Sequence, residues 1–76
     1  MPLSDGVIGK TYSINEISLP VTIQRRLEAL GMTQNATVSI LNRKGKGILI
    51  IKLRGTRFAL GVNITKNITV GEVSVS

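Results

Sequence analysis

The side chains of this sequence that could do chemistry are mainly cations. A basic turn spans residues 43–46, and three more cations follow it at Lys52, Arg54 and Arg57. Lys52 and Arg54 share one face of an extended segment, and a hairpin would bring Arg57 close to them. Such a basic stripe suits an anionic partner, namely a nucleic acid, an anionic lipid surface or an acidic protein face. A solvated hairpin face is the plain alternative.

The overall charge leaves the same two interpretations open. Ten Lys and Arg residues stand against four acids, which gives a formal net charge of +6. Composition alone slightly favours a solvated surface over a bound acidic partner. Small barrels that bind single-stranded nucleic acid usually add aromatic platforms for the bases. Only Tyr12 and Phe58 are aromatic here, and Phe58 is expected in the core, so nucleic-acid binding is not favoured.

Catalytic chemistry finds few candidates in this chain. The sequence contains no His and no Cys, which removes the commonest general base and the usual ligands of zinc. Its acids are scattered, and no two have a spacing that suggests acid–base work: Asp5, Glu16, Glu28 and Glu72. We therefore expect no catalytic residue, no cofactor and no metal site within one monomer, and we expect that the protein is not an enzyme.

The elements that position the cations begin with one short helix. From Val21 the apolar period lengthens, and Ile23, Leu27 and Leu30 fall at i, i+4 and i+7. This spacing predicts a helix over about residues 21–30 that docks on a sheet by these three side chains. Gly31 then stands where a helix needs a left-handed residue. In such a Schellman cap Leu27 and Met32 touch each other.

The rest of the chain has the period of two that is typical of strands. Gly55-Thr56 is expected to turn one β-prone run into the next as a hairpin. The fold class is therefore mostly β: a small barrel or sandwich of five or six antiparallel strands with one short helix beside it. We expect a single domain over residues 1–76 with its core at about 7–75, and a terminal segment outside the core at residues 1–6.

Two further patterns point to a known family. Arg26-Leu27-x-x-Leu30-Gly31-Met32 is followed by Ala36-x-Val38, and later come Gly55 with Ala59-Leu60 and the closing Ile68-Thr69-Val70. In order and spacing these motifs resemble the FeoA family of ferrous-iron transport accessory proteins, over about residues 9–70. Gln34-Asn35 replaces the family's usual proline-glycine. Asn adopts the left-handed conformation more readily than most residues, so the turn should survive.

The resemblance implies a fold and a role. It implies an SH3-like barrel and action with FeoB, a membrane protein that has a cytosolic GTP-binding domain and moves Fe(II) into the cell. Our leading hypothesis is a cytoplasmic accessory protein that docks on FeoB and modulates iron uptake, peripheral to the membrane through this partner. The candidate contacts are on the exposed helix face and the basic turn: Gln24, Arg25, Glu28, Arg43, Lys44 and Lys46. The motif residues expected to build the fold are Leu27, Leu30, Gly31, Met32, Gly55, Ala59 and Leu60.

Other classes remain open at this point. A similar SH3-like domain ends the metal-dependent repressors of the diphtheria-toxin-repressor type, so this chain could be a detached domain of that kind. A small nucleic-acid-binding barrel is the other alternative. Exposed strand edges make a homo-oligomer possible. We expect no direct membrane insertion, because the longest apolar run, residues 47–51, is far shorter than the roughly 20 residues that span a bilayer.

Overall fold

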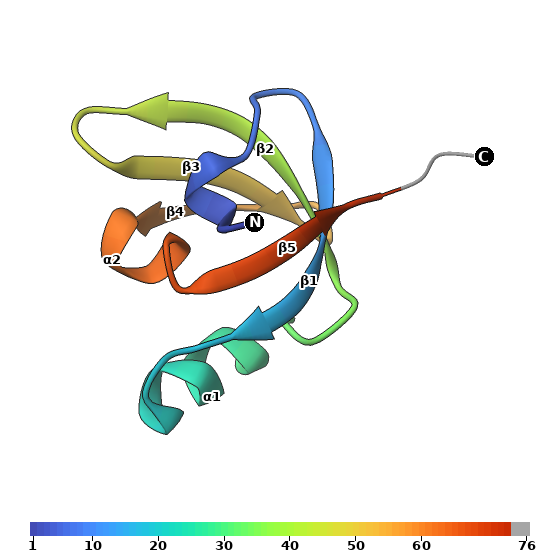
Figure 1. The fold of residues 1–76 in the computed structure, drawn as a ribbon, viewed down its shortest axis with the longest axis vertical. Coiled ribbons are helices and arrows are strands. Elements are labelled where there is room, and N and C mark those ends of the chain that lie inside the picture. The colour runs from blue at the N-terminus through green and yellow to red at the C-terminus, as the bar shows by residue number, and fades with distance from the viewer. Residues whose placement is uncertain (74–76) are drawn as a thin grey trace.

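Five antiparallel strands form one strongly curved sheet in the computed structural model, which describes residues 1–73 (Figure 1). The order across the sheet is β4-β3-β2-β1-β5. The strands are β1 (Thr11–Ile17), β2 (Thr37–Lys44), β3 (Ile48–Leu53), β4 (Thr56–Gly61) and β5 (Ile68–Glu72). The helices are the 3₁₀ turn η1 (Leu3–Asp5), α1 (Val21–Ala29) and α2 (Val62–Thr65). The mostly β fold with one short helix after the first strand is as the sequence predicts; the end of the expected core range, residues 74–75, lies outside the described part.

The strands place alternate side chains inside the curve of the sheet. The core that they form is almost wholly aliphatic, because the chain has only two aromatic residues. Its one aromatic member is Tyr12, which is fully buried. The Tyr12 hydroxyl oxygen accepts a hydrogen bond from the backbone N–H of Val7 at 2.8 Å, so the buried oxygen has a partner. The core residues are Leu3, Tyr12, Ile14, Leu27, Met32, Val38, Ile40, Leu49, Ile51, Leu53, Ile68 and Val70.

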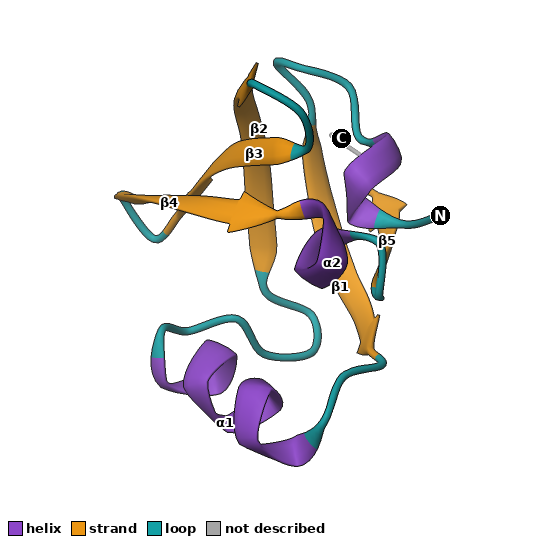
Figure 2. Ribbon diagram, turned by 90° about the vertical axis from the view of Figure 1, so that its left-hand side faces the viewer, coloured by secondary structure: helices purple, strands orange, loops and turns teal. Residues whose placement is uncertain are grey.

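The first residues belong to the core, contrary to the expectation of a terminal segment outside it. Leu3 is fully buried. Pro2 pairs with Thr69 of β5, and the backbone N–H of Val70 donates to the Met1 carbonyl at 2.7 Å. The reason is tertiary: η1 contacts β5 and α2, and α2 contacts β4, so these two short elements link the edge strands of the open sheet (Figure 2). A three-residue turn carries no periodicity, so no pattern in the sequence indicates this link.

The helix α1 ends in the predicted cap. The N–H of Met32 donates to the carbonyl of Leu27 at 2.9 Å, and the N–H of Gly31 donates to the carbonyl of Glu28 at 2.9 Å. Gly31 has φ +98°, and Leu27 and Met32 are both buried. These are the two hydrogen bonds of a Schellman motif, and both residues of its apolar pair lie in the core, so the predicted cap is confirmed.

One residue of the predicted docking face does not pack on the sheet. Leu27 is buried and Ile23 packs against the core, but Leu30 is 45% exposed. The helix ends at Ala29, and Leu30 is its C-cap residue, still in the right-handed helical region with φ −82° and ψ −7°. Leu30 therefore lies beyond the last helical residue with much of its side chain in solvent, and the expectation that Leu30 docks is wrong.

Two left-handed residues shape the turns. Asn35 has φ +70°, so the position that replaces the family's proline-glycine keeps the expected left-handed turn. In the β3–β4 hairpin, Leu53 pairs with Thr56, and the two-residue turn is Arg54-Gly55 with φ +52° and +81°. The hairpin is confirmed, but the turn begins one residue earlier than predicted, so Arg54 is not on the strand face with Lys52.

Candidate functional site

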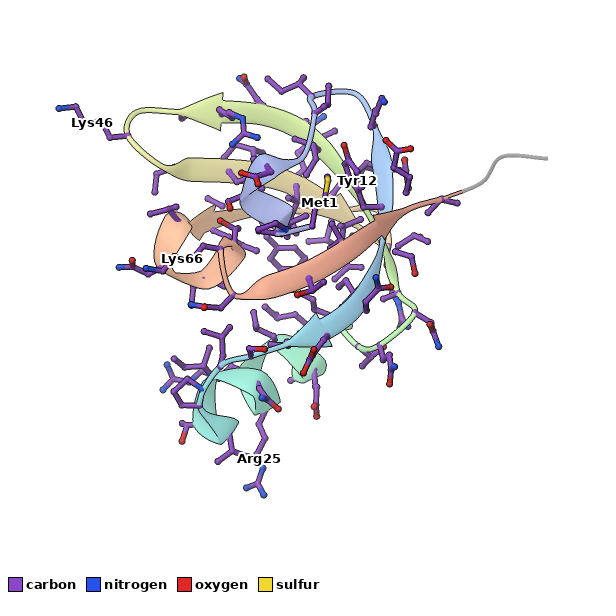
Figure 3. All side chains as sticks on the ribbon, viewed as in Figure 1. Met1, Tyr12, Arg25, Lys46 and Lys66 are labelled. Atoms are coloured by element: carbon purple, nitrogen blue, oxygen red, sulfur yellow. The ribbon has the colours of Figure 1, made fainter. Side chains whose placement is uncertain are left out.

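The six predicted contact residues do not form one surface. Arg25 and Glu28 are exposed on α1, whereas Lys46 lies in the turn between β2 and β3. Figure 3 shows Arg25 and Lys46 at opposite ends of the molecule, which extends 34 Å along its longest axis. A single small contact would reach one of these ends.

At the helix end, Gln24 has an internal role. Its side-chain amide donates to the carbonyls of Ile17 at 2.9 Å and Leu19 at 2.7 Å. These bonds tie α1 to the chain that leaves β1. A groove of about 470 Å³ runs between β1 and α1 and carries two carboxylates. It is lined by Ile14, Asn15, Glu16, Ile17, Gln24, Glu28, Met32, Thr33 and Gln34.

At the opposite end, a β-bulge in β2 determines which of Arg43 and Lys44 faces the inner side of the sheet. Ile40 pairs with Ile51 but Asn42 pairs with Ile50, so Leu41 is the extra residue. A bulge of one residue reverses which side chains face inward. Arg43 therefore shares the inner side with Leu49, its partner on β3.

The inward turn of Arg43 gives it an intramolecular partner. Its guanidinium donates a hydrogen bond to the carbonyl of Gly6, at the end of η1. Lys44 pairs with Ile48 and lies on the outer side of the sheet. Both side chains are exposed, but Arg43 holds the N-terminal segment, whereas Lys44 lies on the outer face of the sheet.

The outer face of β2, β3 and β4 collects the cations into a groove. Lys52 lies directly opposite Arg57, as the predicted hairpin required. Arg57 and Lys44 line a hollow of about 500 Å³, and Lys52 lies beside it as the cross-strand neighbour of Arg57. We call this hollow, with Lys52 at its side, the basic groove; its lining is Leu41, Asn42, Lys44, Ile50 and Arg57.

Sequence reasoning missed the apolar floor of the basic groove. Leu41 and Ile50 are half-buried there. Ile50 belongs to the run Ile48-Leu49-Ile50-Ile51, in which every residue is apolar, so the run itself does not say which side faces outward. Leu41 is placed by the bulge, which has no local sequence signature here.

Arg54, the remaining cation of the predicted stripe, lies elsewhere. A Cβ placed on Gly31 would stand 3.3 Å from the Arg54 Cδ and Nε atoms. The Arg54 side chain thus covers the cap of α1 and links the β3–β4 turn to the helix. Gly55 and Ala59 take their places in this hairpin, and Leu60 packs against the core.

Most of the cations lie in a part of the chain that contains no acid. The four acids lie on η1, β1, α1 and β5, and no acid occurs in residues 29–71. Six of the ten basic residues lie in residues 43–57. Within residues 1–73 the ion pair is Lys10 with Glu72 at 3.4 Å, so the cations of the basic groove have no carboxylate partner in the described chain.

Other kinds of site have little support among the described residues. Tyr12 is buried and Phe58 packs against the core, so neither lines the basic groove. Within residues 1–73 no group of three or more His, Cys, Asp and Glu side chains is placed to hold a metal ion. None of the helices there has the length and apolarity that crossing a membrane requires.

The strongly curved five-stranded antiparallel sheet belongs to the SH3-like class of small barrels, here with a helix inserted after its first strand. Within that class the chain belongs to the FeoA domain family, whose profile matches residues 1–72. The family is accessory to ferrous iron transport. The family assignment and the SH3-like fold that the sequence motifs suggested are both confirmed.

Solved structures agree with this assignment. An iron uptake regulatory protein (FeoA) is 27% identical, with a TM-score of 0.82 over 96% of each chain. FeoA of Stenotrophomonas maltophilia, determined in complex with zinc, is 24% identical with a TM-score of 0.77, over 93% of this chain and 89% of that one. A search of curated protein sequences found no match to this chain.

The same fold occurs in a different class of protein. A manganese-dependent transcriptional repressor has a TM-score of 0.86 over 96% of this chain at 19% identity, but only 41% of the repressor is covered. That likeness concerns the fold, which a repressor domain and an iron-transport accessory share.

Proposed function

We propose that this protein acts in ferrous iron uptake by binding the cytosolic region of a FeoB-like membrane transporter and modulating its activity, without catalysis of its own. The observation that carries the proposal is the FeoA-domain match over residues 1–72. The S. maltophilia relative, itself a FeoA protein, has been proposed to be an activating factor for ferrous iron transport. The protein would then work in the cytoplasm, at the inner face of the membrane through its partner.

The distribution of charge supports a binding role. Six cations gather in residues 43–57 without an acid among them, and complementary charge speeds and orients the encounter of proteins. Of the sequence-predicted contacts, Lys44 and Lys46 stay free to meet a partner at this end, and Arg25 and Glu28 at the helix end. The two ends are the candidate contact surfaces.

Co-purification tests the proposal. The tagged protein should retain the purified cytosolic region of the FeoB-like transporter, and a titration should show saturable binding. If the two proteins fail to bind in either nucleotide state of the GTP-binding domain, transporter binding is not the function.

A further inference from the structure

We propose that the basic groove docks a short acidic segment of the protein partner, in which an apolar side chain lies between carboxylates. The inference rests on the proposed function, because the segment is assigned to the transporter. It specifies one of the two candidate ends as the contact surface, and it states the chemistry of the partner.

The charges of the basic groove call for an anion. Lys52 and Arg57 are cross-strand neighbours on the outer face, and like charges directly opposite each other destabilise a sheet. The strands β2, β3 and β4 hold no Asp or Glu that could relieve this repulsion. A carboxylate placed between the cations would supply the missing counter-charge.

The apolar floor indicates which kind of anion the basic groove binds. Leu41 and Ile50 lie between Lys44 and Arg57 in a hollow of about 500 Å³, within the size range of roughly 300–1,000 Å³ that is usual for binding pockets. A free phosphate would leave this floor unused. A leucine-sized side chain flanked by acids would cover the floor and meet the cations together.

The lining also argues for a peptide over a nucleic acid. Proteins that bind single strands combine cations with aromatic side chains on which the bases stack. The lining of the basic groove has no aromatic member. Its aliphatic floor instead matches the apolar centre and charged rim that protein–protein contacts use.

A defined probe peptide tests the chemistry of the groove. The ¹⁵N-labelled full chain would be titrated with acetyl-Glu-Glu-Leu-Glu-Glu-amide. We expect saturable shifts centred on the amides of Leu41, Asn42, Ile50 and Arg57. Replacing the peptide's leucine by serine should weaken binding about fivefold, because a partly buried leucine contributes roughly 1 kcal/mol. Shifts centred outside the groove, or an unchanged affinity for the serine peptide, would overturn the proposal.

Charge reversal gives the matched control. Lys44→Glu/Arg57→Glu should weaken the peptide about tenfold, from two exposed ion pairs at roughly 0.7 kcal/mol each. Arg25→Glu/Arg26→Glu makes the same change in net charge on α1 and should stay within about twofold, an effect of overall charge alone. Both pairs are exposed, and Lys44→Gln/Arg57→Gln repeats the test without new acids. Equal losses from the two reversals would contradict the groove.

Two other anionic ligands, a nucleic acid and a lipid surface, are compared with the peptide in further titrations. A twelve-residue oligothymidylate and phosphatidylglycerol vesicles would be titrated under the same salt conditions. If either perturbs the basic groove at lower concentration than the peptide does, the face belongs to nucleic acid or lipid and the inference is wrong. Weaker binding of both than of the peptide supports it.

The transporter's cytosolic region separates this inference from the function on which it rests. If the wild type binds that region and Lys44→Glu/Arg57→Glu binds it equally well, the groove is wrong while the proposed function stands. If the wild type fails to bind, the proposed function falls, and with it the claim that the transporter supplies the segment.

Discussion

Lys52 and Arg57 lie directly opposite each other on the outer face of the β3–β4 hairpin, in a stretch of the chain that holds no acid. A like-charged pair of this kind lowers the stability of the isolated sheet. Arg57 of this pair lines a groove with an aliphatic floor, and Lys52 lies beside it. We infer that the protein retains this repulsive pair because the two cations bind an acidic partner.

The first prediction concerns this pair. Lys52→Glu should raise the free energy of unfolding by about 0.5 kcal/mol, because it turns a repulsive cross-strand pair into an attractive one. The gain should shrink as salt screens the charges. Urea unfolding at low and high salt measures both effects.

Lys10→Glu is the matched control for Lys52→Glu, since it changes the net charge equally. Lys10 has an acidic partner in Glu72 at 3.4 Å, so its reversal should leave stability unchanged or lower it. If Lys10→Glu stabilised the protein as much as Lys52→Glu, the effect would come from net charge and not from the pair.

Arg43 and Lys44 of the basic turn should have different roles, one in stability and the other in binding. Arg43→Ala should lower the free energy of unfolding by about 1 kcal/mol, because it removes the hydrogen bond to the Gly6 carbonyl that holds the N-terminal segment. Lys44→Ala should leave stability nearly unchanged and weaken partner binding. Thermal melts and a binding titration of both variants check this; equal stabilities would show that Arg43 does not hold the segment.

Leu27 in α1 and Leu30 at its C-cap should differ sharply in the stability lost when each is replaced. Leu27 is 5% exposed and Leu30 is 45% exposed. Leu27→Ala should cost about 2–5 kcal/mol, the range for a cavity in a core, whereas Leu30→Ala should cost less than about 1 kcal/mol. Denaturant titrations of the two variants give the comparison, and similar losses would place Leu30 in the core after all.

The contact between Gly31 and Arg54 can be measured with two glycines. Gly31 and Gly9 have similar left-handed φ values, +98° and +91°, but a Cβ on Gly9 meets nothing within 4 Å. Both alanine variants should lose about 1–2 kcal/mol from the backbone. Gly31→Ala should lose more, because its methyl group displaces the Arg54 side chain.

A double-mutant cycle isolates that excess. In an Arg54→Ala background the cost of Gly31→Ala should fall to that of Gly9→Ala. An excess that persists without the arginine side chain would mean that the cap, and not Arg54, is the cause.

Local chemistry made much of the fold predictable. The helix and its cap follow from the spacing of Leu27, Gly31 and Met32, because a Schellman motif involves only neighbouring residues. The hairpin follows from a glycine between two β-prone runs, although the turn itself starts at Arg54. The positions that failed depend on distant contacts: Leu3 is buried because η1 joins β5 and α2, and no local pattern records that.

The candidate site was predictable only in part. The sequence brought Lys52 and Arg57 together through the hairpin, and it pointed to Lys44. The sequence did not predict that Arg43 faces inward and Lys44 faces outward. The bulge at Leu41 reverses the two sides of the strand, and no glycine or proline marks it. The same bulge places Leu41 in the floor of the basic groove. The apolar part of the site could therefore not be predicted from the sequence.

The most direct test of the account maps the partner onto the surface. The ¹⁵N-labelled protein would be titrated with the unlabelled cytosolic region of the FeoB-like transporter, and the loss of amide signal would be followed residue by residue. We expect that signals of β2, β3 and β4 around Leu41, Ile50 and Arg57 are lost first, while those of α1 around Arg25 persist. Loss centred on α1, with the basic groove unaffected, would contradict it.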